Sequence, residues 1–166
     1  MRKLILMALL VALAIPAAAI AAGTPAQNAA AQATCRAQRS QIGAAAFKLL
    51  YAPTANANQA NAFGKCVSGA VKSEQANAAA AVASCKAAQA ADRAAFKTQY
   101  GSFGKCISAK TSAADKAHQA ATIAAAKSCK TERAAGVAAF TTKYGTGSNK
   151  SDAFGKCVAG KVKTTS

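Results

Sequence analysis

Apolar residues recur along this chain at helical spacing, separated by long runs of alanine. Three Phe and Tyr pairs are each four residues apart, which places both rings of a pair on one face of a helix. The pairs are Phe47 with Tyr51, Phe96 with Tyr100, and Phe140 with Tyr144. The residues between them are mostly Ala with Lys, Arg, Gln and Glu, which have high helix propensity. The pattern predicts an all-α protein in which alanine serves as filler.

Further apolar stripes indicate that a second helix begins after each pair. Their positions follow the i, i+3, i+4, i+7 rhythm of a buried helix face. One stripe contains Phe63, Cys66, Val67, Ala70 and Val71, and another contains Phe154, Cys157, Val158 and Val162. Asn61, Ser102 and Asp152 suit N-caps of these helices, and Gly101 and Gly145 suit left-handed helix ends. The segments Pro53–Gln59 and Gly145–Ser151 are rich in turn residues and predict loops.

The sequence Phe-Gly-Lys-Cys occurs three times, at Phe63–Cys66, Phe103–Cys106 and Phe154–Cys157. Each copy follows a Cys, a Phe and a Tyr, and every Cys, Phe and Tyr of the chain belongs to this pattern. We therefore expect three tandem, disulfide-stapled helix-loop-helix repeats at residues 35–72, 73–111 and 112–166. Alanine-rich helix at Val67–Ser84 and Ile107–Ser128 would join them, unless Ser112 and Asp115 start a new helix.

The full pattern, Cys…Phe…Tyr-Gly…Ala-Phe-Gly-Lys-Cys, resembles a group of uncharacterised, alanine-rich, predicted secreted bacterial proteins. The resemblance covers about Cys35 to Lys163. The second copy departs from the pattern because almost nothing separates Tyr100 from Phe103. The resemblance implies a repeat fold and no particular activity.

The N-terminus has the order of a secretory signal peptide at residues 1–21. Two basic residues precede the apolar stretch Leu4–Ile15, and Pro16 and small residues follow it. Cleavage after Ala19 or Ala21 would leave residues 22–34 as a flexible N-terminal segment. The alternative is an uncleaved anchor, because Leu4–Ala22 carries no charge and approaches the length of a membrane span. Pro16 and the weak apolarity of alanine favour cleavage.

An even number of Cys in a small exported protein predicts disulfides, here three. The six residues are Cys35, Cys66, Cys85, Cys106, Cys129 and Cys157, which allow fifteen connectivities. The repeats favour pairing each Cys with the one that closes its own unit. In the second unit this requires a helix from Cys85 to loosen near Phe96, because the short return to Cys106 could not otherwise span the distance. The alternative is a different partner for the middle pair.

Charge points to an anionic partner outside the cytoplasm. The chain has 21 Lys and Arg against five Asp and Glu, a net charge of +16, and signal cleavage removes Arg2 and Lys3 to leave +14. Such a field concentrates polyanions. We expect wall polymers, acidic polysaccharide, extracellular nucleic acid or anionic lipid headgroups as partners, with no small-molecule substrate.

Each Phe-Gly-Lys-Cys copy is also a candidate anion site at a helix start, where backbone N–H groups and a lysine face outward. The residues are Gly64, Lys65, Gly104, Lys105, Gly155 and Lys156. The alternative is that each Gly lets a disulfide or ring pass closely while the Lys is a solubilising surface residue.

Catalytic chemistry finds little support in the sequence. His118 stands alone on a polar stretch, the carboxylates are scattered singly, and no metal or cofactor motif occurs. The sequence favours a non-enzymatic, secreted or envelope-associated cationic helical protein that binds anionic polymers through dispersed Lys and Arg. A membrane-active helical protein and a thiol-redox protein are the alternatives.

Overall fold

The computed structural model describes residues 23–52, 61–146 and 148–164. These residues form seven α-helices and no strand, which confirms the all-α prediction. The predicted signal peptide at residues 1–21 and most of the Pro53–Gln59 loop lie outside the described residues. The helices are α1 (Pro25–Ile42), α2 (Ala44–Tyr51), α3 (Ala62–Ala91), α4 (Arg93–Tyr100), α5 (Phe103–Ala135), α6 (Val137–Tyr144) and α7 (Ala153–Lys163).

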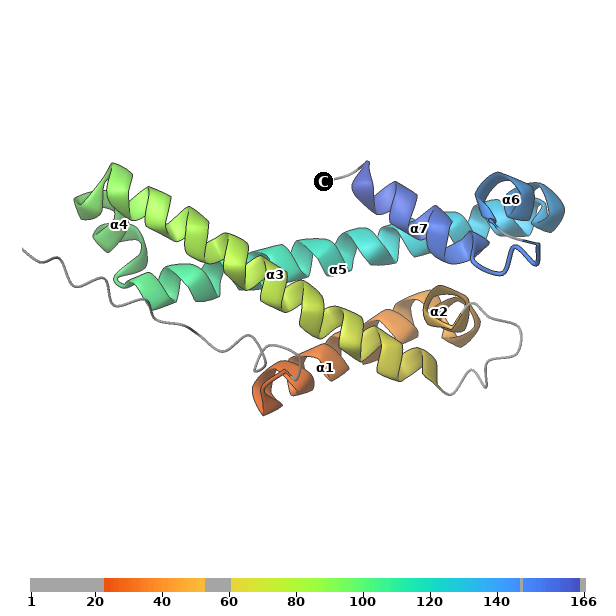
Figure 1. The fold of residues 1–166 in the computed structure, drawn as a ribbon, viewed down its shortest axis with the longest axis horizontal. Coiled ribbons are helices and arrows are strands. Elements are labelled where there is room, and N and C mark those ends of the chain that lie inside the picture. Colours follow the sequence, from red (N-terminus) through yellow and green to blue (C-terminus); the bar gives the residue numbers. More distant parts are fainter. Residues whose placement is uncertain (1–22, 53–60, 147, 165–166) are drawn as a thin grey trace, which may run out of the picture.

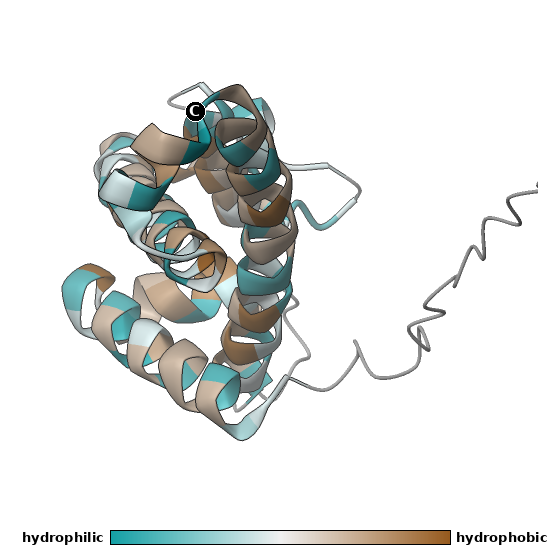
Figure 2. Cartoon of the chain, turned by 90° about the vertical axis from the view of Figure 1, so that its left-hand side faces the viewer, coloured by the Kyte–Doolittle hydropathy of each residue, from teal (hydrophilic) through white to brown (hydrophobic). Residues whose placement is uncertain are grey.

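The two long helices α3 and α5 form an antiparallel hairpin with α4 at its closed end (Figure 1). Helices α1 and α2 pack near the start of α3, and α6 and α7 pack near the end of α5. Both long helices are continuous, so α5 passes through Ser112 and Asp115 and the alternative of a new helix there is wrong. Figure 2 shows that most helical residues are only weakly hydrophobic and that strongly hydrophobic ones are few.

A local break recurs three times. Helices α1, α3 and α5 each end one residue before Gly43, Asp92 or Gly136, and an eight-residue helix follows each break. Gly43 has a φ of 86°, which favours glycine, whereas Asp92 caps α4 by accepting a hydrogen bond from the Ala95 N–H. The helix from Cys85 therefore ends at Ala91. The prediction that it continues and loosens near Phe96 is wrong in position, because Asp92 starts a new helix.

Each short helix brings its ring pair onto one face, as the spacing predicts. Ring centroids are 4.8 Å apart for Phe47 and Tyr51, and 5.2 Å apart for Phe96 and Tyr100. The third pair, Phe140 with Tyr144, is 4.9 Å apart.

Each short helix then returns the chain so that a disulfide closes the unit. The bonds are Cys35–Cys66, Cys85–Cys106 and Cys129–Cys157, with Cα atoms 6.0 to 6.1 Å apart. All six Cys are buried. The structure thus confirms the connectivity that the repeats favoured, and no Cys is free.

The three units do not pack in chain order. Residues of the first and third units share one core, which includes Phe47, Cys66, Ala126, Cys129 and Phe154. The second unit has its own small cluster of Cys85, Phe96 and Cys106 at the far end of the hairpin. The local arrangement recurs, but that the units are tandem repeats stays a prediction.

Several details of the helix ends differ from expectation. The segment at residues 22–34, expected to be flexible, is helical from Pro25 onward, because Thr24 and Gln27 form a capping box and Ala31 is buried. Ser102 caps α5 with its side chain, whereas Asn61 makes no such bond. Gly101 ends α4 with a positive φ of 72°, as expected, but Gly145 is extended with a φ of −78°.

Candidate functional site

Four of the five carboxylates are engaged within the chain. Asp92 caps α4, and Asp115 Oδ1 accepts a hydrogen bond of 2.7 Å from Asn77 Nδ2. Glu132 and Asp152 bind lysines of the third unit. All 19 Lys and Arg beyond Arg2 and Lys3 lie in the described part, and ion pairs there involve only three lysines. Most of the positive charge therefore has no carboxylate partner among the described residues.

Glu132 is the centre of the ion pairs in the third unit. Its Oε1 lies 2.7 Å from Lys143 Nζ, and its Oε2 lies 3.5 Å from Lys161 Nζ. The Tyr144 hydroxyl donates to both of these carboxylate oxygens. The hydrogen bond from Lys143, followed by that from Tyr144, holds the pKa of Glu132 below its ordinary value. The hydrogen bond between Lys143 and Glu132 also raises the pKa of Lys143. This cluster ties α5, α6 and α7 together.

The third Phe-Gly-Lys-Cys copy binds the protein's own groups. Lys156 Nζ donates to Thr146 Oγ1 at 2.8 Å and lies 3.5 Å from Asp152 Oδ2. Thr146 also donates its N–H to Asp152 at 2.9 Å, and the hydrogen bonds from Thr146 lower the pKa of Asp152. A Cβ on Gly155 would lie 3.7 Å from the Leu50 carbonyl oxygen of α2. An external anion at this helix start would have to compete with Asp152.

The first two copies are open to solvent. Gly64, Lys65, Gly104 and Lys105 are all exposed, and a Cβ on either Gly would meet nothing within 4 Å. The alternative explanation, that these Gly residues let a ring or disulfide pass closely, is therefore wrong for both copies. The three copies begin three different helices, and the structure does not gather them into one anion site (Figure 1).

At the first copy, Lys65 lies beside a shallow hollow of about 440 Å³ along α3 that Asn61, Ser68 and Lys72 also line. At the second copy, the Lys105 N–H donates to Ser102 Oγ at 3.3 Å, so one of the helix-start donors is already satisfied. Neither copy carries a built anion pocket, and each offers exposed positive charge.

A groove of about 740 Å³ lies among α1, α2, α3 and α5. Glu74 and Asp115 both line it, and the Glu74 pKa is raised by partial burial and by the charge of Asp115. Their common place in the groove had no signal in the sequence, because it results from the packing of α3 against α5.

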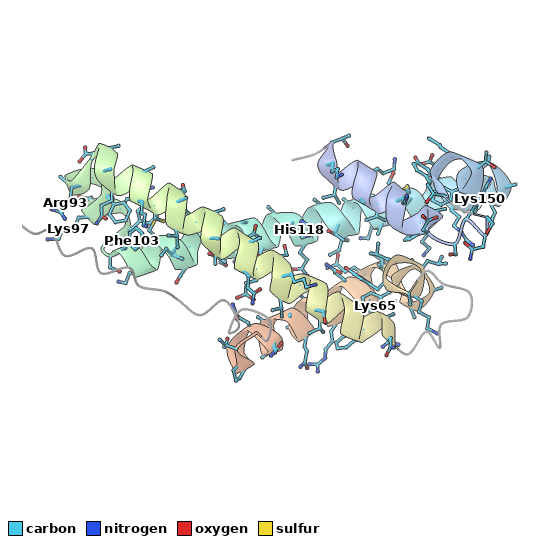
Figure 3. The ribbon with its side chains drawn as sticks, viewed as in Figure 1. Lys65, Arg93, Lys97, Phe103, His118 and Lys150 are labelled. Carbon is cyan, nitrogen blue, oxygen red and sulfur yellow. A yellow bond between two sulfur atoms is a disulfide. The ribbon has the colours of Figure 1, made fainter. Side chains whose placement is uncertain are left out.

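The same groove contains a partly buried polar pair. Tyr51 donates its hydroxyl to Oε1 of the buried Gln38 at 2.6 Å, and burial raises the pKa of Tyr51 to about 12. Thr111 Oγ1 is buried without a partner among the described residues. His118 lines the groove from α5 and is exposed (Figure 3). The hydrogen bond between Tyr51 and Gln38 joins α2 to α1 at this groove.

Two further properties of the described residues concern metal binding and membrane spans. No group of three or more His, Cys, Asp or Glu among them is placed to hold a metal ion. None of the helices described is both long and apolar enough to cross a membrane. No protein family, characterised protein or solved structure was found to match the chain.

Proposed function

We propose that this protein is a non-enzymatic, exported cationic helical protein that binds anionic polymers at the cell envelope or outside the cell. The observation that carries the proposal is the imbalance of charge: sixteen of the 19 Lys and Arg beyond the first three residues have no carboxylate partner in the described part. A surface of this kind attracts polyanions at long range and releases their counterions on contact.

The disulfides support the proposed location. Three disulfides, all buried, indicate an oxidising, extracytoplasmic environment. They also account for how a chain with so few large apolar residues holds one shape. Secretion through the N-terminal segment is part of the proposal, since that segment lies outside the described residues.

The exposed surface favours polymer binding over membrane disruption. Among the described residues, Val137 is the one large hydrophobic residue that is prominently exposed, at 51%. Membrane-active amphipathic helices need a broad apolar face for insertion. The thiol-redox alternative needs a reactive thiol, and all six Cys are paired and buried.

Binding of the mature protein to wall extract or to a purified polyanion tests the proposal, with an uncharged polysaccharide as the matched control. We expect binding to the polyanion alone, with an affinity that falls steeply between about 50 and 200 mM salt. Equal binding at both salt concentrations, or equal binding to the uncharged polymer, would refute it. Dye release from anionic vesicles would instead support the membrane-active alternative.

A further inference from the structure

The second unit projects from the rest of the molecule as a separately packed tip. We define the hairpin tip as residues 85–110, the end of α3, all of α4 and the start of α5 (Figure 1). Its core consists of the Cys85–Cys106 disulfide and the buried Phe96. The ring centroid of Phe96 lies 6.4 Å from that of Phe103. None of these residues belongs to the main core. The tip therefore presents its surface away from the body of the protein.

Five cations surround this small core and none of them has an ion-pair partner in the described chain. Four are exposed and Lys110 is half-buried; the set is Lys86, Arg93, Lys97, Lys105 and Lys110. The one carboxylate in the tip, Asp92, already accepts the Ala95 N–H as the cap of α4. The third unit differs, because there the carboxylates neutralise lysines.

The fold holds these cations in place. Arg93 and Lys97 lie one helical turn apart on α4, and Figure 3 shows both at the free end of the hairpin. The Lys97 carbonyl accepts the Gly101 N–H at 2.9 Å, and the Lys105 stem passes 4.0 Å from the position of a Cβ on Gly101. Lys97 lies in the last turn of α4, where the helix dipole favours positive charge, and the Lys105 stem passes the residue that ends this helix. Holding the backbone of the charged groups in advance lowers the entropy lost on binding.

We propose that the hairpin tip is the surface that binds a flexible phosphodiester polymer through its backbone charges. This inference rests on the proposed function. It places the main contacts with the polymer at the hairpin tip, where the proposed function alone would spread them over all the Lys and Arg. Four of the five cations are lysines, which act as point charges and impose no planar, bidentate geometry. Tip aromatics pack against the tip core and offer no free stacking platform, so the polymer's charges, and not its bases, are recognised. The absence of a large exposed apolar residue among the described tip residues separates this ligand from a lipid surface.

The test compares two triple variants that each lose three positive charges. The tip variant is Arg93→Gln, Lys97→Gln and Lys105→Gln, and the control is K116Q, K127Q and K130Q, three exposed lysines of α5 outside the tip. Fluorescence anisotropy with single-stranded oligothymidylate over a salt series gives the slope of log affinity against log salt. Each phosphate contact on a single strand contributes about −0.7 to this slope, so the tip variant should lose about 2 units of slope. The control should keep the wild-type slope.

Further arms separate the possible failures. A third triple variant, R93K with K97R and K105R, keeps the three positive charges and should keep the wild-type salt slope. Measured helix content and the absence of free thiols confirm that each variant is folded. Poly(glycerol phosphate), which has no bases, should bind with the slope of oligothymidylate. The tip inference is overturned if both triple variants lose the same slope, if the tip variant loses none, or if only the base-bearing polymer or a carboxylate polymer binds. If the wild type binds no polyanion in a salt-dependent way, the proposed function itself fails.

Discussion

Replacing both Cys85 and Cys106 by alanine should open the hairpin tip while the rest of the protein stays folded. The disulfide spans a sequence separation of 21 residues, for which the chain-entropy model gives about 3.4 kcal/mol at 25 °C. Alanine suits these positions because both Cys are fully buried, and a serine hydroxyl there would lack a partner. The variant therefore isolates the loss of the cross-link.

The tip has little else to hold it. Its buried residues are the two Cys and Phe96, and complete burial of a Phe side chain contributes about 1.5 to 3 kcal/mol. The disulfide thus contributes at least as much to the stability of the tip as the burial of its apolar side chain does. The shared core of the first and third units contains sixteen buried residues and two further disulfides, so it does not depend on the tip bond.

Amide hydrogen exchange read by mass spectrometry measures this difference directly. Loss of about 3.4 kcal/mol corresponds to roughly a 300-fold fall in protection for the amides of Arg93–Tyr100. Protection around Ile123–Cys129, in the shared core, should not change. If α4 keeps its protection, the packing of the tip outweighs its cross-link. If both segments lose protection together, the molecule is one cooperative unit and the division into two cores has no energetic meaning.

Three further predictions concern the shared core and the loops. Tyr51→Phe removes the donor to the buried Gln38 and should lower the free energy of unfolding by about 1 to 3 kcal/mol in urea, whereas Tyr100→Phe should cost less, because no hydrogen bond of that hydroxyl appears among the described residues. Equal losses would contradict this. The Glu132 pKa is lowered in the folded state from a usual value of 4.5, so its contribution is complete above about pH 4.5 and is lost as pH falls through the lower folded value. Glu132→Gln should therefore flatten the fall in thermal midpoint below that pH, and an unchanged profile would contradict the role of this carboxylate. Gly145→Ala would place a Cβ 2.6 Å from a backbone carbonyl oxygen, so we expect about 1 to 3 kcal/mol of destabilisation by thermal melting, while Gly64→Ala, in open space, should not destabilise.

Local features of the fold follow from the sequence because they depend on residues close in the chain. The four-residue spacing of Phe96 and Tyr100 fixes their common helix face, and each Phe-Gly-Lys-Cys copy brings its Cys back to the preceding one. The break at Asp92 also has a local cause, since Asp is a preferred N-cap, but an alanine-rich helix on both sides hides the signal.

The groove could not be predicted in this way. Glu74 and Asp115 line the same groove because α3 and α5 pack in one particular register, which no short motif specifies. Lys156 differs in part, because its ion pair with Asp152 is four residues apart in sequence and is therefore a local contact. Its hydrogen bond to Thr146 depends on the loop that brings Thr146 to Asp152, and no local spacing indicates it.

The first and third units pack together because α3 and α5 have nearly the same length. Helix α3 has 30 residues and α5 has 33, about 45 and 50 Å at 1.5 Å per residue. Because two antiparallel helices of nearly equal length end at the same level, α5 returns the third unit to the start of α3 and to the first unit. Alanine is then part of the core and not filler, since Ala125 and Ala126 are buried where the units meet and small side chains allow helices to approach closely. The shared core is therefore specified by the number of residues in two helices and by alanines on their inner faces, a property spread over the whole hairpin that the three repeated motifs do not contain.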